Sequence, residues 1–163
     1  MTILTRRYRF SASHRLHSLE LSESENQQLY GKCNYPYGHG HDYVLEVSVR
    51  GPVDPVTGVV IPAAKLDRLV SDTVLSVFAS RNLNLDVCEF RSVVPTTENI
   101  AKIILGHLQR AWLDYIDAPA VQLQRVYIQE TDRNSFEILA EVPRPDTPSE
   151  VAGRVAERVI VHG

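Results

Sequence analysis

The hydrophobic pattern changes its period twice along the chain, and this change limits the fold more than any other feature. Alternation of apolar and polar residues, which is typical of strands, appears near both ends, whereas the middle shows helical spacing. Strands are predicted at residues 3–14, 39–51, 121–130 and 136–142, and helices at 63–79 and from Thr96 or Thr97 onward. The order ββααββ predicts an α+β fold, in which a four-stranded antiparallel sheet carries both helices on one face.

The length and the last residues indicate one domain followed by an extension. A chain of 163 residues is close to the usual size of a single domain. The run PRPDTPSE, which begins after Val142, is rich in proline and polar residues, as linkers are. We therefore predict one domain over residues 1–142 and a C-terminal extension over residues 143–163.

Charge and hydropathy exclude several classes of protein. The formal net charge of -3, without a basic stripe, argues against nucleic-acid binding. No segment reaches the ~18 consecutive apolar residues of a membrane span, and the N-terminus lacks a secretion signal. We therefore expect a cytoplasmic protein with no nucleic-acid or membrane partner, in which Cys33 and Cys88 remain reduced.

Three histidines occupy positions from which they can bind one metal ion. His39 and His41 lie two residues apart on a predicted strand, so both side chains point to the same face. His14 ends the preceding predicted strand, and pairing of the two strands would bring all three imidazoles together. Three imidazole ligands with a fourth position open for water or substrate are typical of catalytic zinc sites. Nickel or iron would also accept these ligands, and an isolated HxH pattern is often only a pair of exposed strand histidines.

Five segments resemble those of the 6-pyruvoyl-tetrahydropterin synthase family, in the same order and at similar spacing. They are FSASHRL (10–16), GKCNYPYGHGHDY (31–43), VDPVTGVV (53–60), PTTENIA (95–101) and ETDRN (130–134). The related 6-carboxy-tetrahydropterin synthases usually have fewer than the five residues that separate Cys33 from the HxH pattern here. The resemblance implies a tunnelling fold, in which three monomers form a barrel and two trimers stack into a hexamer. It also implies zinc bound by the residues that match His14, His39 and His41.

The resemblance implies roles for four further residues. The cysteine that matches Cys33 acts as a base on the substrate side chain, and the glutamate that matches Glu130 binds the pterin ring. The residues that match Thr97 and Glu98 lie near the pterin of an adjacent subunit. Taken without the family, these residues equally allow a buried inert cysteine, a surface carboxylate and a helix cap.

One part of the family's pattern is absent. After the first helix the family normally has an Asp-His pair that works with the cysteine in proton transfer, whereas this chain has FASRNLN, with Ala79 and Ser80 at those positions. Neither side chain can relay a proton as the pair does. We therefore expect altered or reduced lyase activity on 7,8-dihydroneopterin triphosphate or a related pterin, within tetrahydrobiopterin biosynthesis. The alternatives are a pterin-binding protein without catalytic activity and a 6-carboxy-tetrahydropterin synthase of the queuosine pathway.

Four other residues with reactive or ionisable side chains receive no role. Cys88 has no motif around it and is expected to pack against the core after the first helix. His17, His107 and His162 are expected to be exposed to solvent rather than to bind a metal.

Overall fold

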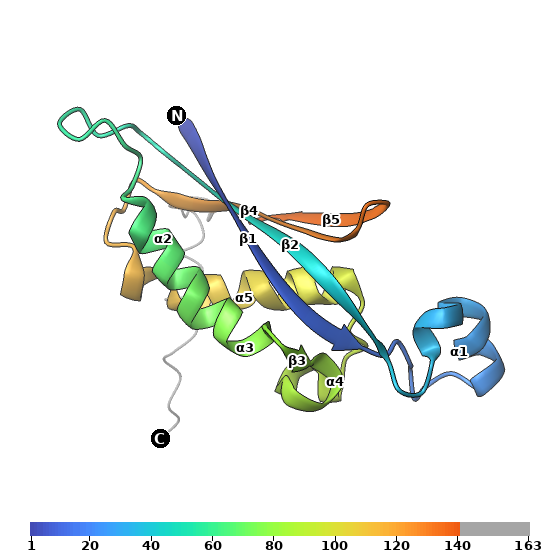
Figure 1. Ribbon diagram of the computed structural model, residues 1–163. Coiled ribbons are helices and arrows are strands. Elements are labelled where there is room, and N and C mark those ends of the chain that lie inside the picture. The colour runs from blue at the N-terminus through green and yellow to red at the C-terminus, as the bar shows by residue number, and fades with distance from the viewer. Residues whose placement is uncertain (141–163) are drawn as a thin grey trace, which may run out of the picture.

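The computed structural model describes residues 1–140, and its centre is a single twisted sheet (Figure 1). The strands are β1 (Thr2–His14), β2 (His39–Gly51), β3 (Arg81–Asn82), β4 (Gln122–Thr131) and β5 (Asn134–Leu139). They lie in the order β3-β1-β2-β4-β5. The pairs β1/β2, β2/β4 and β4/β5 are antiparallel, which confirms the four predicted strands and their antiparallel arrangement.

The two-residue strand β3 adds a fifth member that the sequence did not predict, and it runs parallel to β1. Ser80, just before it, has a left-handed φ of 60°, which turns the chain sharply after the preceding helix. The backbone N–H of Ser80 then donates to the carbonyl oxygen of Ser11 at 2.7 Å, and this bond aligns the next residues with β1. Two residues are too few to produce a visible alternation, so the pattern could not reveal this strand.

Both predicted helices are present. The first consists of α2 (Ala63–Val70), a π-helical turn η2 (Ser71–Leu75) and α3 (Ser76–Phe78), which follow one another without a break. The second is α5 (Thr97–Tyr115), and Thr96 is its N-cap because its side chain accepts from the Asn99 N–H at 3.3 Å. Between them lie the short α4 (Leu83–Asp86) and a 3₁₀ turn, η3 (Cys88–Arg91).

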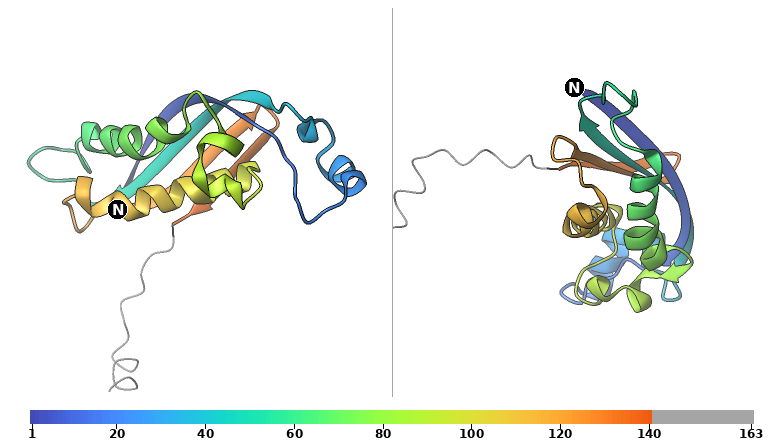
Figure 2. Two further views of the ribbon diagram at one scale, coloured as in Figure 1. Left: turned by 90° about the horizontal axis from the view of Figure 1, so that it is seen from below. Right: turned by 90° about the vertical axis from the view of Figure 1, so that its left-hand side faces the viewer.

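The helices α2 and α5 cover one face of the sheet, as predicted (Figure 1; Figure 2). Apolar side chains of the strands meet the apolar stripes of the helices there, and burial of each large one contributes about 1.5–3 kcal/mol. The fully buried core includes Tyr43, Leu45, Val47, Leu66, Leu69, Val74, Phe78, Ile100, Ile104 and Leu108.

The other face of the sheet is polar and no described helix covers it (Figure 2). Glu46 on β2 pairs with Arg7 on β1 and with Arg125 on β4, each at 2.7 Å, and Arg125 also pairs with Glu137 on β5 at 3.1 Å. This ladder of alternating charges crosses four strands. The helix-covered face therefore holds the core, and the ladder face remains open to a partner or to solvent.

A helix stands between β1 and β2, where the hydrophobic pattern predicted no element. It is α1 (Glu23–Tyr30), followed by a 3₁₀ turn, η1 (Gly31–Asn34), and Figure 1 shows both beyond the ends of β1 and β2. Ser22 and Glu25 form a complete capping box at its start. Only Asn26 of this helix is buried, so there was no apolar stripe to predict it, although the Ser-x-x-Glu spacing was visible.

The predicted C-terminal extension and His162 lie outside the described residues. None of the helices between residues 1 and 140 combines the length and apolar character needed to cross a membrane.

Candidate metal centre

The pairing of β1 with β2 brings the three predicted histidines together. In this antiparallel register His14 lies directly opposite His39, and His41 follows two residues later on the same face. The ring centroid of His14 lies 4.9 Å from that of His39 and 5.1 Å from that of His41, and the centroids of His39 and His41 are 4.7 Å apart. One nitrogen from each ring lies within 4.8 Å of the other two, so these side chains could hold one metal ion.

Two of these nitrogen atoms have no other partner. The Nε2 atoms of His14 and His41 are buried and make no hydrogen bond. The Nδ1 of His14 lies 2.8 Å from the carbonyl oxygen of Pro95, which can only accept, so Nδ1 carries the proton and Nε2 presents a lone pair. A carbonyl that fixes the tautomer in this way is the usual outer partner of a metal-binding histidine. The donor set therefore fits a metal ion that prefers imidazole.

Electrostatics favour the neutral form of two of these rings, those of His14 and His39. Burial lowers the pKa of His14 to about 4, against the opposing effects of the Pro95 carbonyl and of Glu130. Burial and the neighbouring His41 also lower the pKa of His39. Neutral imidazole is the form that binds metals, so His14 and His39 do not have to lose a proton at neutral pH before a metal can enter.

Glu130, near the end of β4, lies beside this cluster. Its Oε1 is 3.6 Å from the Nε2 of His14 and 3.8 Å from that of His41, and its side chain is only 12% exposed. Burial opposes ionisation, but hydrogen bonds from Asn134 and Thr97 together with the two histidines lower the pKa of Glu130. The carboxylate is therefore ionised at neutral pH and positioned to accept hydrogen bonds from a ligand.

The two residues at the start of α5 differ in their surroundings. Thr97 is 3% exposed and supports the ionised carboxylate of Glu130, whereas Glu98 is exposed. The N-cap is Thr96, so neither Thr97 nor Glu98 is needed to cap the helix.

Cys33 lies on η1 and shares a pocket of ≈ 730 Å³ with His39. The segment is held against the end of β1, because the Leu16 N–H donates to the Cys33 carbonyl oxygen at 2.8 Å. Burial and the negative charge of Glu130 raise the pKa of the half-buried Cys33 thiol. A nearby cation is therefore needed before Cys33 can act as a thiolate at neutral pH.

Gly38 sets how closely the Cys33 loop approaches β1. Its φ is +68°, and a Cβ atom at this position would lie 2.7 Å from the carbonyl oxygen of His14. Only glycine accepts both the left-handed backbone and this approach without strain. The residue before His39 thus fixes the spacing of two of the three histidines.

Ala79 and Ser80 lie outside the pocket that contains Cys33. Ala79 packs against the core, and the exposed Ser80 lines a separate hollow with His41 and Asp42. No ionisable group stands at these two positions, in keeping with the predicted loss of the proton relay.

Three of the residues without a predicted role lie elsewhere than expected. His107 is only 14% exposed, because its ring contacts Phe78 and bonds to Glu89 at 2.6 Å and to the Thr73 carbonyl at 2.9 Å. His17 is 18% exposed and bonds to Asn34. Cys88, expected in the core, is exposed because η3 turns it outward.

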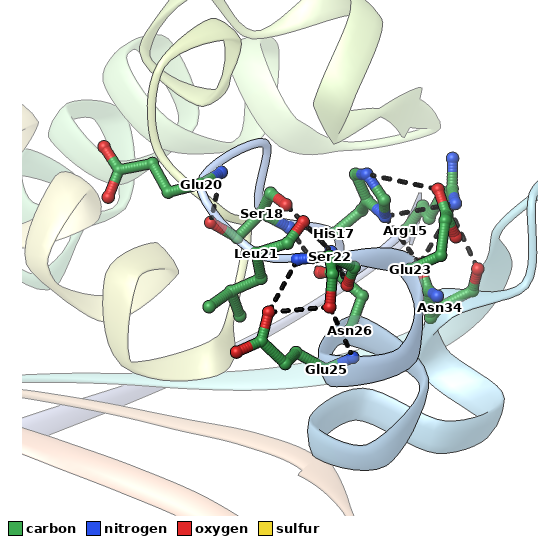
Figure 3. A network of polar contacts seen from close by, with 10 residues as sticks. All are labelled: Arg15, His17, Ser18, Glu20, Leu21, Ser22, Glu23, Glu25, Asn26 and Asn34. Atoms are coloured by element: carbon green, nitrogen blue, oxygen red, sulfur yellow. Dashed lines mark hydrogen bonds and ion pairs between the residues drawn. The ribbon is translucent and has the colours of Figure 1, made fainter.

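The sequence interpretation also missed Arg15, which directly follows His14. Arg15 lines the pocket of Cys33 and belongs to a polar network with His17 and Asn34 (Figure 3). Its place next to a predicted metal ligand was the only signal that could have pointed to it.

Comparisons with known proteins indicate one family. The sequence model described as 6-pyruvoyl tetrahydropterin synthase matches residues 3–141. A Poecilia reticulata protein named 6-pyruvoyl tetrahydrobiopterin synthase is 46% identical over 131 residues, which cover 80% of this chain and 85% of that protein. The Homo sapiens protein of the same name is 44% identical over 131 residues, which cover 80% of this chain and 86% of that protein.

Solved structures are similar over the same region. Caenorhabditis elegans 6-pyruvoyl tetrahydropterin synthase has a TM-score of 0.78 at 41% identity, and the match covers 86% of this chain and 96% of that one. The structure of 6-pyruvoyl tetrahydropterin synthase from Plasmodium vivax has a TM-score of 0.59 at 15% identity, and the match covers 87% of this chain and 100% of that one. At this identity the likeness shows the fold alone. The predicted α+β, tunnelling-type fold is thereby confirmed.

Proposed function

The chain belongs to the 6-pyruvoyl tetrahydropterin synthase family, and on that premise we propose that it is a zinc-dependent lyase of 7,8-dihydroneopterin triphosphate or a related pterin, with altered or reduced activity. The observation that carries this proposal is the cluster of His14, His39 and His41, in which two buried Nε2 atoms make no hydrogen bond within residues 1–140. A catalytic metal site needs such a cluster beside a pocket, and the pocket of Cys33 adjoins it.

Zinc fits these donors better than magnesium or calcium, which prefer oxygen ligands. Three protein ligands leave a position for an oxygen of the substrate side chain, and Lewis acidity toward that oxygen is what a bound zinc ion supplies. The ordered tautomer of His14 keeps its ring in the orientation required for this role.

Glu130 is the group we assign to the pterin ring. An ionised carboxylate can accept two parallel hydrogen bonds, and the exocyclic amino group and the adjacent ring N–H of a pterin offer two donors side by side. Asn134 donates to Glu130 Oε2 at 2.8 Å and holds the carboxylate in place. Thr97 stabilises the ionised form of Glu130 by a hydrogen bond. We assign the exposed Glu98 to contact with the pterin of an adjacent subunit.

Cys33 is the group we assign as base. Its thiolate, stabilised by the charge of a bound metal, would remove a proton from a carbon of the substrate side chain, and departure of the triphosphate would follow. The proton must then be passed on, and Ala79 and Ser80 offer no acid-base group for that step. The absence of such a group typically costs about 10²- to 10⁴-fold in rate.

The same absence favours a second candidate function, which is pterin binding without turnover. In that case the metal and Glu130 would serve recognition alone, and Cys33 would be inert. The 6-carboxy product of the queuosine pathway is the less favoured chemical outcome, because five residues separate Cys33 from His39.

We further propose a trimer or hexamer. Strand β5 leaves an edge of the sheet unpaired among the described residues, and the charged ladder face has no covering layer. Open edges of this kind are usually paired or covered in stable proteins. Light scattering at micromolar protein that reports a monomer would exclude this assembly.

The decisive experiment is turnover by zinc-loaded protein supplied with 7,8-dihydroneopterin triphosphate. We expect slow release of triphosphate together with a change in the pterin side chain, both abolished by Cys33→Ala. Tight binding without release would support the binding protein instead. Failure to bind any reduced pterin, by a protein that holds zinc, would exclude both functions.

A further inference from the structure

Arg15 places a positive charge in the wall of the pocket that contains Cys33 and His39. Its backbone is fixed from both sides by Asn84, which accepts from the Arg15 N–H at 2.7 Å and donates to the Arg15 carbonyl at 2.9 Å. These two bonds hold the Arg15 backbone immediately after β1, and the half-buried Arg15 side chain lines the pocket.

The guanidinium of Arg15 is held by two oxygen atoms of Asn34 (Figure 3). Its Nε donates to the Asn34 carbonyl at 3.1 Å, and its Nη2 donates to the Asn34 side-chain oxygen at 3.0 Å and lies 3.2 Å from His17 Nδ1. Within residues 1–140 no carboxylate lies within 4.0 Å of it, and Nη1 has no acceptor. A half-buried cation without a counter-ion is costly unless an anion joins it in function.

Two arginines of the sheet, by comparison, have carboxylate partners. Arg6 forms a two-bond pair with Asp67, and Arg125 pairs with Glu46 and Glu137. Arg15 is half-buried and lines a pocket, but it has no such partner among residues 1–140.

Two more charged residues line the same pocket. Lys32 is exposed at its rim and makes no ion pair within the described chain. Glu23 is acidic, but its side chain is 82% exposed, and its Oε1 lies 4.0 Å from His17 Nε2. The inner wall is therefore positive, with the acidic group at the mouth.

We propose that Arg15, assisted by Lys32, is an anion subsite that binds the polyphosphate arm of the substrate. This inference rests on the proposed function for the identity of the ligand, and on the pocket for the site. The free Nη1 and the remaining Nη2 proton of a guanidinium suit phosphate oxygens, which planar donors bind in pairs. A pocket of ≈ 730 Å³ also has room for a ligand longer than a pterin ring.

The subsite would orient the substrate. With the ring at Glu130 and the side chain at the histidines, the phosphate arm would extend past Cys33 to Arg15. The leaving group would then lie along the wall that also carries the base, so binding of the phosphates would position the side-chain carbon for proton removal.

The test is calorimetry on zinc-loaded full-length protein with three probes: 7,8-dihydroneopterin triphosphate, 7,8-dihydroneopterin without phosphate, and inorganic tripolyphosphate. Arg15→Gln should weaken binding of both phosphorylated probes by about 10- to 100-fold, as expected for loss of charged hydrogen bonds, and change the affinity for the unphosphorylated pterin by less than about twofold. The affinity of Arg15→Lys for the phosphorylated probes should lie between those of the unmodified protein and Arg15→Gln, because lysine keeps the charge but loses the paired donors. The matched control is Arg91→Gln, which removes an exposed arginine that lines none of these pockets and should change nothing.

The outcomes separate this inference from the proposed function. If Arg15→Gln weakens binding of the unphosphorylated pterin as much as binding of the triphosphate, Arg15 only supports the Asn34 loop and the subsite is refuted. If tripolyphosphate binds in an Arg15-dependent way but no pterin binds, the subsite stands and the proposed function fails. If Arg15→Gln does not fold, Lys32→Gln, at an exposed position, decides instead. A loss of affinity of about threefold or more for the two phosphorylated probes, without a loss for the unphosphorylated pterin, supports the subsite. Unchanged affinity for the phosphorylated probes refutes it.

Discussion

Replacement of Gly38 by alanine should damage the metal centre without touching a histidine. Alanine in the left-handed conformation costs about 1–2 kcal/mol. At this position the new Cβ would also lie 2.7 Å from the His14 carbonyl oxygen, and relief of such an overlap typically costs a further ~1–3 kcal/mol. The chain must move apart there, and the movement separates His39 from His14.

Gly58→Ala is the matched control. Gly58 has a φ of +73° but nothing within 4 Å of the position of a Cβ, so it should show the conformational cost alone. For a domain of this size about 3 °C in melting temperature corresponds to 1 kcal/mol. Metal-free Gly38→Ala should therefore melt about 6–15 °C below the unmodified protein, and Gly58→Ala about 3–6 °C below it.

Zinc affinity, measured by competition with a chromophoric chelator, supplies the second readout. Gly38→Ala should bind zinc about 10- to 100-fold more weakly, in the range seen when groups that orient metal ligands are removed. Gly58→Ala should bind zinc normally, and His14→Ala should lose the site. Unchanged zinc affinity in Gly38→Ala would show that the approach of this turn to β1 does not set the spacing of the histidines.

Three further outcomes are expected. Glu130→Ala should weaken the binding of a reduced pterin by about 2–3 kcal/mol in calorimetry, while Glu98→Ala has a much smaller effect; equal losses would remove the special role of Glu130. The double change Ala79→Asp with Ser80→His should raise the rate of triphosphate release, because it restores the acid-base pair. Histidine tolerates the left-handed φ of 60° at position 80. If the unmodified protein is already as fast as relatives with the Asp-His pair, the missing relay is refuted. Burial alone would raise the pKa of Glu89, but hydrogen bonds from the neighbouring cysteine and histidine lower it from 4.5 to about 2. The contribution of Glu89 to the free energy of unfolding is thus present above pH 4.5 and lost as the pH falls toward 2. Metal-free Glu89→Gln should therefore be about 1–2 kcal/mol less stable than the unmodified protein at pH 7 and should lose less stability on acidification. Parallel curves of stability against pH for the two proteins would contradict this.

The long strands and helices were predictable because each has one face in the core. In β2 the residues Tyr43, Leu45, Val47 and Val49 are all buried, and this alternation is written directly in the sequence. The stripe of α5 is equally visible, since Ile100, Ile104 and Leu108 recur every four residues and are fully buried.

Elements that bury little apolar surface left no such pattern. Helix α1 depends on its capping box and on Asn26, whose side-chain amide donates to three backbone carbonyls, those of Ser18, Leu21 and Ser22. Strand β3 depends on backbone pairing of Arg81 and Asn82 with β1 after the left-handed turn at Ser80. Interactions of this kind connect residues through the backbone, where side-chain periodicity carries no information.

The sequence by itself determined that His39 and His41 share a face, because a strand has a period of two whatever surrounds it. Only the tertiary structure decided that His14 lies opposite His39, that Pro95 fixes its tautomer, and that Glu130 closes the cluster. It alone also placed Arg15 in the pocket without a carboxylate partner. The physical reason is that strand register and long-range packing are set by the free energy of the whole core, whereas the direction of neighbouring side chains is set by local backbone geometry.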